Sequence, residues 1–108
     1  MHVVTEKHLK EAAKQYPGAA AQIAAWRAIA RDARWRSFID LQQVFSDADR
    51  VGDYVIFNIG RNRYRLVTII HYSREPEGGT AEGHIWIRSF LTNKQYENAA
   101  NWDKGVVR

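Results

Sequence analysis

The chain has 108 residues, 45% of them hydrophobic and 26% charged, so its length and composition predict one globular domain spanning residues 1–108. Its aromatic residues supply apolar area for a core, which excludes disorder as a description of the whole chain. No apolar run approaches the ~20 residues of a membrane-spanning helix. The absence of cysteine excludes disulfide scaffolds, Cys-zinc sites and thiol catalysis. Because the first ten residues are charged where an export signal would be apolar, we expect a cytoplasmic protein.

Positive charge is concentrated in two places, and the net charge is +4. Residues 54–74 contain no acid and four arginines: Arg61, Arg63, Arg65 and Arg74. A second cluster has only Asp32 as a counter-charge and consists of Arg27, Arg31, Arg34 and Arg36. Because the planar guanidinium group suits phosphate and stacks on bases, this distribution favours an anionic partner, either nucleic acid or an acidic protein. A solvated basic surface is the simpler interpretation of the second cluster, with ribosomal RNA or an acidic protein as its functional alternatives.

The first third of the chain predicts two helices after a very short strand at Val3 and Val4. Thr5 is expected to cap the first helix through its hydroxyl. Apolar residues then recur at the spacing of one helical face, at Leu9, Ala12, Ala13 and Tyr16. Pro17-Gly18 ends this helix, and an alanine-rich segment from about 19 to 33 predicts the second. Two helices joined in this way form an αα-hairpin.

The remaining two thirds predict strands with short helical segments at either end. Apolar residues between Phe38 and Phe45 suggest a short third helix, and the polar segment Ser46–Asp53 predicts a loop. Alternation with a period of two then predicts three strands, at Tyr54–Ile59, Arg63–Tyr72 and His84–Leu91, with a turn at 60–62 and a long connection at 74–83. Thr92 is expected to cap a final helix through about Ala99. The predicted fold class is α+β, with an N-terminal αα-hairpin packed on a small twisted antiparallel sheet and a short C-terminal helix.

Strand alternation predicts which side chains share a face of the sheet. In the second strand the face with the arginines holds Arg63, Arg65, Val67, Ile69 and His71. In the third strand we expect Ile85, Ile87 and Leu91 opposite His84, Trp86, Arg88 and Phe90. If Arg65 and Arg88 emerge on one face, they form a cationic site beside aromatic residues, which suits single-stranded RNA. The same alternation is equally consistent with a simpler interpretation, in which both arginines extend into water and form no site.

Two segments together carry a family pattern. YVIFNIGRNRYRLVTIIHY (residues 54–72) followed by IWIRSFLTNKQYE (residues 85–97) resembles the HigB-type toxins of bacterial type II toxin–antitoxin modules, within the RelE/ParE-like superfamily. The shared pattern is Y-V-F-N-I, G-N and Y-R-L, then I-R, L-T-H and E-Y. The N-terminal VVTEKHLKEAAKQYP is similar to the opening helix of the family, so the resemblance covers nearly the whole chain.

The resemblance implies a RelE-like fold and a ribosome-dependent endonuclease that cleaves mRNA in the ribosomal A site. It implies an enzyme without metal or other cofactor, inhibited by a co-encoded HigA-like helix-turn-helix antitoxin. The RNA 2′-hydroxyl would attack the neighbouring phosphate, and two arginines would stabilise the charge that develops. Proton transfer falls to Tyr96 or Lys94, with His84 or His71 as weaker candidates.

Carried over residue by residue, the resemblance places Asn62, Arg65, Arg88, Thr92 and Tyr96 on recurrent family positions. The candidate catalytic set is Arg65, Arg88, Tyr96, Asn93 and Lys94. The candidate RNA-binding set is Arg61, Asn62, Arg63, Thr92 and Trp86. Two positions depart from the pattern, since Asn93 stands where the family commonly has His, and Arg61 where many members have a second glycine. Because an amide does not titrate near neutral pH, Asn93 predicts a weakened enzyme.

Other interpretations of the same residues remain open. The chain could be a non-catalytic binding protein of the same fold, either a gyrase-type or a decayed toxin, or a plain RNA-binding module. Tyr96 could be a helix packing residue, and Trp86 and Trp102 could be core or antitoxin-contact residues. The four histidines are spaced too widely along the chain to suggest a metal site.

Overall fold

A computed structural model describes residues 1–61, 63–73 and 83–102 of the chain. Asn62 and nearly all of the connection predicted at 74–83 therefore lie outside the described residues. The elements, in chain order, are β1 (His2–Val4), α1 (Lys7–Gln15), the 3-10 turn η1 (Pro17–Ala19), α2 (Ala20–Asp32), α3 (Phe38–Gln42), β2 (Asp49–Val51), β3 (Tyr54–Ile59), β4 (Tyr64–His71), β5 (His84–Thr92), α4 (Asn93–Glu97) and the 3-10 turn η2 (Ala99–Asn101). In the described part of the chain, no helix is both long and apolar enough to cross a membrane.

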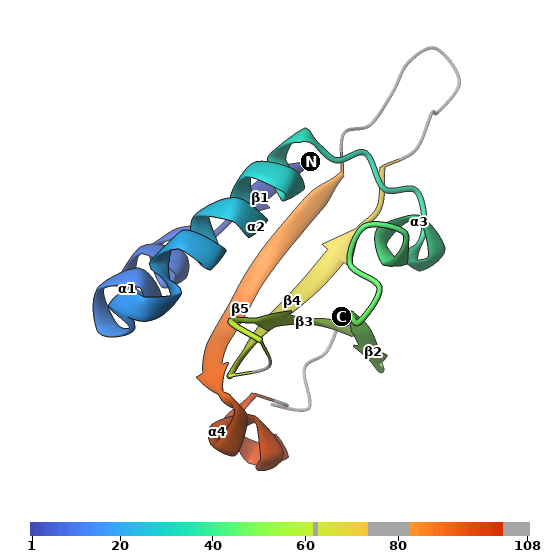
Figure 1. Ribbon diagram of the computed structural model, residues 1–108. Coiled ribbons are helices and arrows are strands. Elements are labelled where there is room, and N and C mark those ends of the chain that lie inside the picture. Colours follow the sequence, from blue (N-terminus) through green and yellow to red (C-terminus); the bar gives the residue numbers. More distant parts are fainter. Residues whose placement is uncertain (62, 74–82, 103–108) are drawn as a thin grey trace.

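The strands form one sheet in the order β1-β5-β4-β3-β2 (Figure 1). Strands β2 to β5 pair antiparallel with their neighbours, whereas β1 pairs parallel with β5. The predicted α+β class is confirmed. The prediction of an antiparallel sheet is wrong at one edge. There β1 pairs with β5, which is not its neighbour in the sequence, and the two strands run in the same direction.

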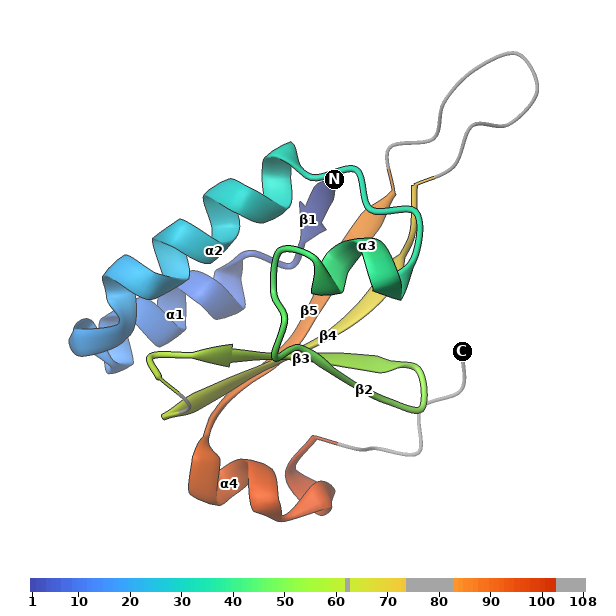
Figure 2. The same cartoon turned by 45° about the vertical axis from the view of Figure 1, so that its right-hand side comes forward.

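Helices cover both faces of the sheet unequally. Figure 2 shows α1, α2 and α3 on one side and α4 on the other. The larger core lies under the first three helices, where Trp26 of α2 packs edge-on against Phe57 of β3 with ring centroids 5.2 Å apart. Leu9, Ile23 and Leu41 join this core from the three helices. Burying these side chains stabilises the helices, which are too short to persist alone.

A smaller cluster occupies the opposite face, which we call the α4 face. Its buried members are Tyr54, Ile56, Val67 and Trp102, and Ile69, Leu91 and Tyr96 pack against it. The side chains of β4 alternate between the two faces, so Arg65 lies on the α4 face with Val67 and Ile69.

A β-bulge changes the predicted faces of β5. Val67 pairs with Ser89 but Thr68 pairs with Ile87, so Arg88 is an extra residue on β5. Beyond the bulge, Leu91 packs with the α4-face cluster and Phe90 with the larger core. The prediction for these two residues is wrong, because strict alternation does not anticipate an inserted residue.

Three local predictions also need correction. Thr5 has a positive φ of 66°, and the cap residue of α1 is Glu6, without a side-chain hydrogen bond to the helix. The predicted loop Ser46–Asp53 contains the exposed edge strand β2, whose polar residues gave no strand signal. Helix α4 ends at Glu97, before the predicted Ala99. The cap predicted at Thr92 is confirmed, since its side chain accepts from the backbone N–H of Gln95.

Candidate nucleic-acid interface

Arg65 and Tyr96 meet on the α4 face. The guanidinium carbon of Arg65 lies 5.7 Å from the ring centroid of Tyr96, within the range of a cation–π contact. Arg65 is half-buried, and its Nη1 also donates to the carbonyl of Tyr64 at 3.3 Å. The structure therefore brings together two residues of the candidate catalytic set.

Trp102 holds Tyr96 in place. The two rings stack with centroids 5.0 Å apart and 14° between their planes, and the indole N–H of Trp102 donates to the carbonyl of Tyr96 at 2.9 Å. Trp102 in turn packs edge-on against Tyr54, 5.3 Å away. Tyr96 is thus both a packing residue and the aromatic partner of Arg65, and the core interpretation of Trp102 is confirmed because this side chain is buried.

The environment of Tyr96 keeps its phenol protonated. Burial raises the pKa of Tyr96, the negative charge of Asp49 raises it further, and the positive charge of Arg65 opposes both effects. A neutral phenol is a proton donor, so near neutral pH this group is suited to act as an acid rather than as a base.

Arg88 extends the positive charge along β5. It is exposed, and it lies two residues from Trp86, which pairs with Ile69 of the α4 face. Arg88, the extra residue of the bulge, therefore lies on the strand next to the one that carries Arg65. Among the described residues, no carboxylate forms an ion pair with Arg88.

The start of α4 is fixed by reciprocal hydrogen bonds. The side chain of Gln95 accepts from the N–H of Thr92 at 2.9 Å, which completes a capping box with the bond that Thr92 accepts. The backbone N–H of Asn93 donates to the carbonyl of Arg63 at 2.9 Å and connects α4 with the β3–β4 turn. Asn93 and Lys94 are exposed beside this junction.

The β3–β4 turn has a left-handed backbone. Gly60 and Arg61 have φ values of 64° and 56°. This left-handed conformation is energetically unfavourable for any residue that has a Cβ atom. A glycine at position 61 would avoid this cost. Arg63 precedes the first residue of β4, and with Arg61 it lines a groove beside Gln22 of α2. The prediction that Arg63 shares a strand face with Arg65 is therefore wrong, because Arg63 belongs to the turn.

Trp86 and the second arginine cluster lie apart from Tyr96. Trp86 is 39% exposed, so the core interpretation of this residue is wrong.

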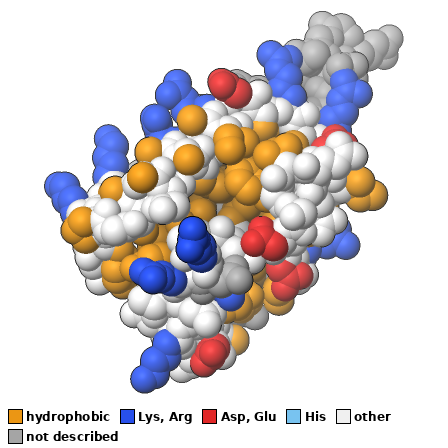
Figure 3. All heavy atoms as spheres, in the orientation of Figure 1, with side chains coloured by type: hydrophobic (Ala, Val, Ile, Leu, Met, Phe, Trp, Pro, Cys, Tyr) orange, Lys and Arg blue, Asp and Glu red, His pale blue; other side chains and the backbone are white. Residues whose placement is uncertain are grey.

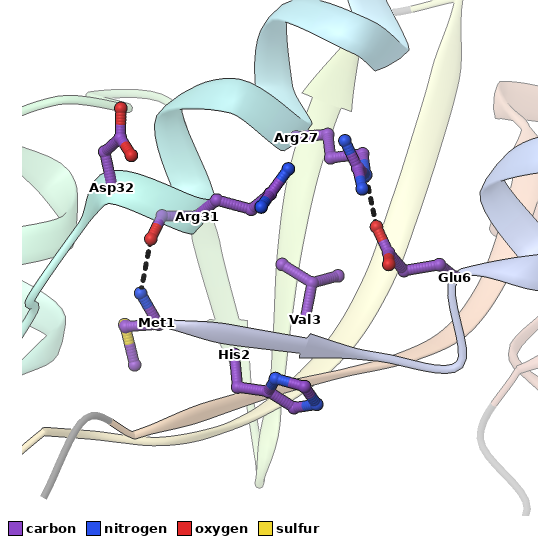
Figure 4. Close-up of a pocket in the computed structure, with 7 residues that line it drawn as sticks. All are labelled: Met1, His2, Val3, Glu6, Arg27, Arg31 and Asp32. Atoms are coloured by element: carbon purple, nitrogen blue, oxygen red, sulfur yellow. Dashed lines mark hydrogen bonds and ion pairs between the residues drawn. The ribbon is translucent and has the colours of Figure 1, made fainter.

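Within the second arginine cluster, Arg27 bonds to Glu6 of the α1 cap, and Figure 4 shows both beside a pocket between α2 and β1. This bond lowers the pKa of Glu6. In Figure 3, Lys and Arg side chains project from several parts of the surface, with few Asp and Glu among them.

Sequence reasoning missed several residues that shape the interface. Asp49 lies on the predicted loop, yet it is close enough to raise the pKa of Tyr96. Tyr54 supports Trp102 from the first strand of the predicted hairpin. Neither residue carried a signal, because their proximity to Tyr96 depends on how β2 and β3 pair with the rest of the sheet.

The fold and this surface define a class: an α+β protein whose sheet presents arginines and an ordered tyrosine on one face. The chain belongs to the HigB toxin family, the RelE-like toxic component of a toxin–antitoxin system, because the family model matches residues 19–99. It is 26% identical over 100 residues to the mRNA interferase toxin HigB of Escherichia coli K12, covering 90% of this chain and 88% of the relative. The same values relate it to the mRNA interferase HigB of Escherichia coli O157:H7 and of Shigella flexneri.

Proposed function

We propose that this toxin is an endonuclease that cleaves mRNA in the ribosomal A site, and that a HigA-like helix-turn-helix antitoxin inhibits it. The relatives named mRNA interferases cover most of both chains, which supports this activity over a non-catalytic binding function. We further propose that residues 1–108 form one RelE-like domain, in which α1 and α2 are the helical hairpin. One observation carries the proposal for the site, namely the contact of Arg65 with Tyr96, on β4 and α4, next to the strand that carries the exposed Arg88.

The proposed reaction uses the 2′-hydroxyl of the message as the nucleophile. Its oxygen gives its proton to water and forms a bond to the adjacent phosphorus, and the bond from phosphorus to the 5′-oxygen breaks, which leaves a cyclic phosphate and a 5′-hydroxyl. Arg65 and Arg88 stabilise the added negative charge on the phosphate oxygens. Tyr96, held neutral by its surroundings, donates a proton to the departing 5′-oxygen. Alignment of the message comes from the ribosome, which supplies proximity that this small protein does not.

The remaining candidates are assigned to the message around the cleaved bond. Lys94 and Asn93 lie exposed at the start of α4, where a positive charge and an amide can contact phosphate or ribose. Arg61 and Arg63 flank the adjoining turn, and we propose that they contact the RNA backbone, together with Thr92 and Asn62.

Arginine substitutions test the site. In a reconstituted translation reaction with a defined message, we expect Arg65→Ala and Arg88→Ala each to lower the cleavage rate at least 100-fold. Lys10→Ala is the matched control, because it removes a positive charge from the exposed side of α1 and should cleave normally. Primer extension gives the cut sites, and circular dichroism checks folding. Normal cleavage by folded Arg65→Ala and Arg88→Ala proteins would refute the site.

Asn93 supports a second part of the proposal, that this enzyme is weakened. A histidine at this position can exchange a proton near neutral pH, whereas the amide cannot. We therefore expect Asn93→His to raise the cleavage rate by about 10-fold or more, within the usual contribution of acid–base catalysis. Asn93→Gln, which changes the side chain without adding a titrating group, is the control. An unchanged rate for Asn93→His would show that the amide is no handicap.

A further inference from the structure

Three histidines that are far apart in the sequence form a row across the sheet. His2 of β1 pairs with His84 of β5, and His84 pairs with His71 of β4. All three side chains are exposed. The rings of His2 and His84 meet edge to face with centroids 5.6 Å apart. The described side chains provide no group of three or more residues able to hold a metal ion.

Trp86 stands directly beside the row. Its ring lies 6.1 Å from that of His84 with an interplanar angle of 25°, and 6.3 Å from that of His71 at 65°. We call His2, His71, His84 and Trp86 together the Trp86 platform. Two neighbouring rings restrict the orientation of the indole, although 39% of the residue remains open to solvent. Restricting an exposed aromatic ring before binding reduces the entropy that a ligand must overcome.

The platform lies on the face that carries the proposed cleavage site. Trp86 pairs with Ile69, which is four residues from Arg65 along β4, a span of about 13 Å at ~3.3 Å per residue. Arg88 lies on β5 between Trp86 and the end of the strand that leads to α4. A path of positive and aromatic side chains therefore runs from Tyr96 past the two arginines to the platform.

Charge identifies the kind of ligand. The three strands that carry the platform, β1, β4 and β5, contain no Asp or Glu in their printed bounds. Imidazole N–H groups donate to phosphate oxygens, and an indole face stacks on any base. Although Asp53 lines a pocket with His71, and Glu6 one with His2, the strands themselves present only imidazole, indole and guanidinium groups on this face. This combination suits single-stranded RNA better than an acidic protein, which has no base to stack on the indole.

We propose that the Trp86 platform is a second RNA subsite of this toxin, where one base of the message stacks on Trp86 while the imidazoles contact its phosphate. The inference rests on the proposed function, since the RNA is the strand that is cleaved near Arg65. The nucleotide stacked on Trp86 is not one of the two that the cleaved bond joins. It lies as far from that bond as Trp86 lies from Arg65 along the sheet. The subsite therefore contributes to binding of the message rather than to the chemical step.

Single-turnover cleavage on programmed ribosomes tests the subsite. We expect Trp86→Ala to raise the toxin concentration for half-maximal rate at least fivefold while changing the maximal rate little, because one stacked base contributes about 1–3 kcal/mol. Trp86→Phe keeps an aromatic face and should restore most of the affinity. Ile29→Ala is the matched control, since Ile29 is 42% exposed on α2 and lies away from this face.

Messages with one abasic nucleotide identify the base. For the unmodified toxin, removing one particular base near the cut should raise the half-maximal concentration, and Trp86→Ala should lose nothing further on that message. Equal effects of every abasic position on both proteins would refute the subsite. So would a Trp86→Ala protein that cleaves normally but fails to bind its antitoxin, which would make the platform a protein-binding surface. If Arg65→Ala lost cleavage while Trp86→Ala cleaved like the unmodified toxin at every concentration, the subsite would be refuted and the proposed function would stand.

Discussion

Tyr96 illustrates how one side chain is shaped by residues from three parts of the chain. Its ring stacks on Trp102, faces the guanidinium group of Arg65 and lies in the field of Asp49. The pKa of the phenol is raised mainly because burial disfavours the phenolate. The same contacts that order the ring therefore also keep its proton in place.

This raised pKa has a consequence for activity against pH. If Tyr96 is the proton donor, cleavage should persist through the ordinary pKa of tyrosine and decline only at higher pH, where the phenol ionises. Tyr96→Phe should lower the rate about 100-fold at neutral pH and remove this alkaline limb, since the stacked ring is retained. Single-turnover rates against pH measure both effects. A Tyr96→Phe rate equal to that of the unmodified toxin would exclude Tyr96 as the acid.

The same pKa affects stability in the alkaline range. The folded protein retains the Tyr96 proton in a pH window where the unfolded chain has lost it, so the unfolded state binds fewer protons there. The stabilising effect is complete below the ordinary tyrosine pKa and is lost as pH rises through the raised value. Glu6 acts at the opposite end of the scale, because its lowered pKa gives stability that is lost as pH falls.

At the scale of elements, Gly83 precedes β5 at a position where no residue with a side chain fits. Its φ is 86°, and a Cβ there would lie 2.7 Å from the backbone nitrogen of Ser73 and 2.8 Å from the carbonyl oxygen of His71. Its own carbonyl accepts from the N–H of His2 at 3.0 Å. Three strands, β1, β4 and β5, thus converge on one position that has no room for a side chain.

Alanine substitutions of glycine should separate crowding from backbone strain. We expect Gly83→Ala to destabilise the fold by about 2–4 kcal/mol, because it combines a left-handed φ with contacts that backbone atoms must yield to. Gly52→Ala should cost about 1 kcal/mol, since φ is 59° but nothing lies within 4 Å of the added Cβ. Gly18→Ala, with neither feature, is the control. Urea unfolding measures all three, and equal stabilities would contradict the crowded geometry.

The elements also show what a single sequence predicts and what it leaves out. The sequence predicts both ends of β3, β4 and β5 to within one residue, because apolar alternation is strong where one face is buried. The edge strand β2 was missed because all three of its residues are exposed. The bulge at Arg88 was missed because it depends on how two strands pair, which neither strand's own pattern records.

The candidate site was predictable in part for the same reason. Arg65, Arg88 and Tyr96 could be named from local patterns and a family resemblance, but the contact between Arg65 and Tyr96 needs the turn from β5 into α4. The histidine row could not be predicted at all. His2, His71 and His84 become neighbours only through the parallel pairing of β1 and the register of β4 with β5.

At the scale of the whole molecule, Trp102 closes the α4 face. It packs on Tyr54 and Tyr96 and is buried. Trp102→Ala should therefore destabilise the fold by about 3 kcal/mol and lower cleavage further than stability alone explains, because Tyr96 loses its support. Trp102→Phe, which retains a stacked ring, is the control. Thermal melts and cleavage rates measured well below the melting temperature distinguish the two effects.

The parallel pairing of β1 with β5 joins His2–Val4 to a strand that is synthesised after β2, β3 and β4. Until residues 84–92 have left the exit tunnel, His2–Val4 has no partner strand, and neither Arg88 nor Tyr96 is in place. A partly synthesised toxin therefore lacks both its finished sheet and its proposed site. Completion of the sheet and completion of the proposed site are therefore one event, because both require β5.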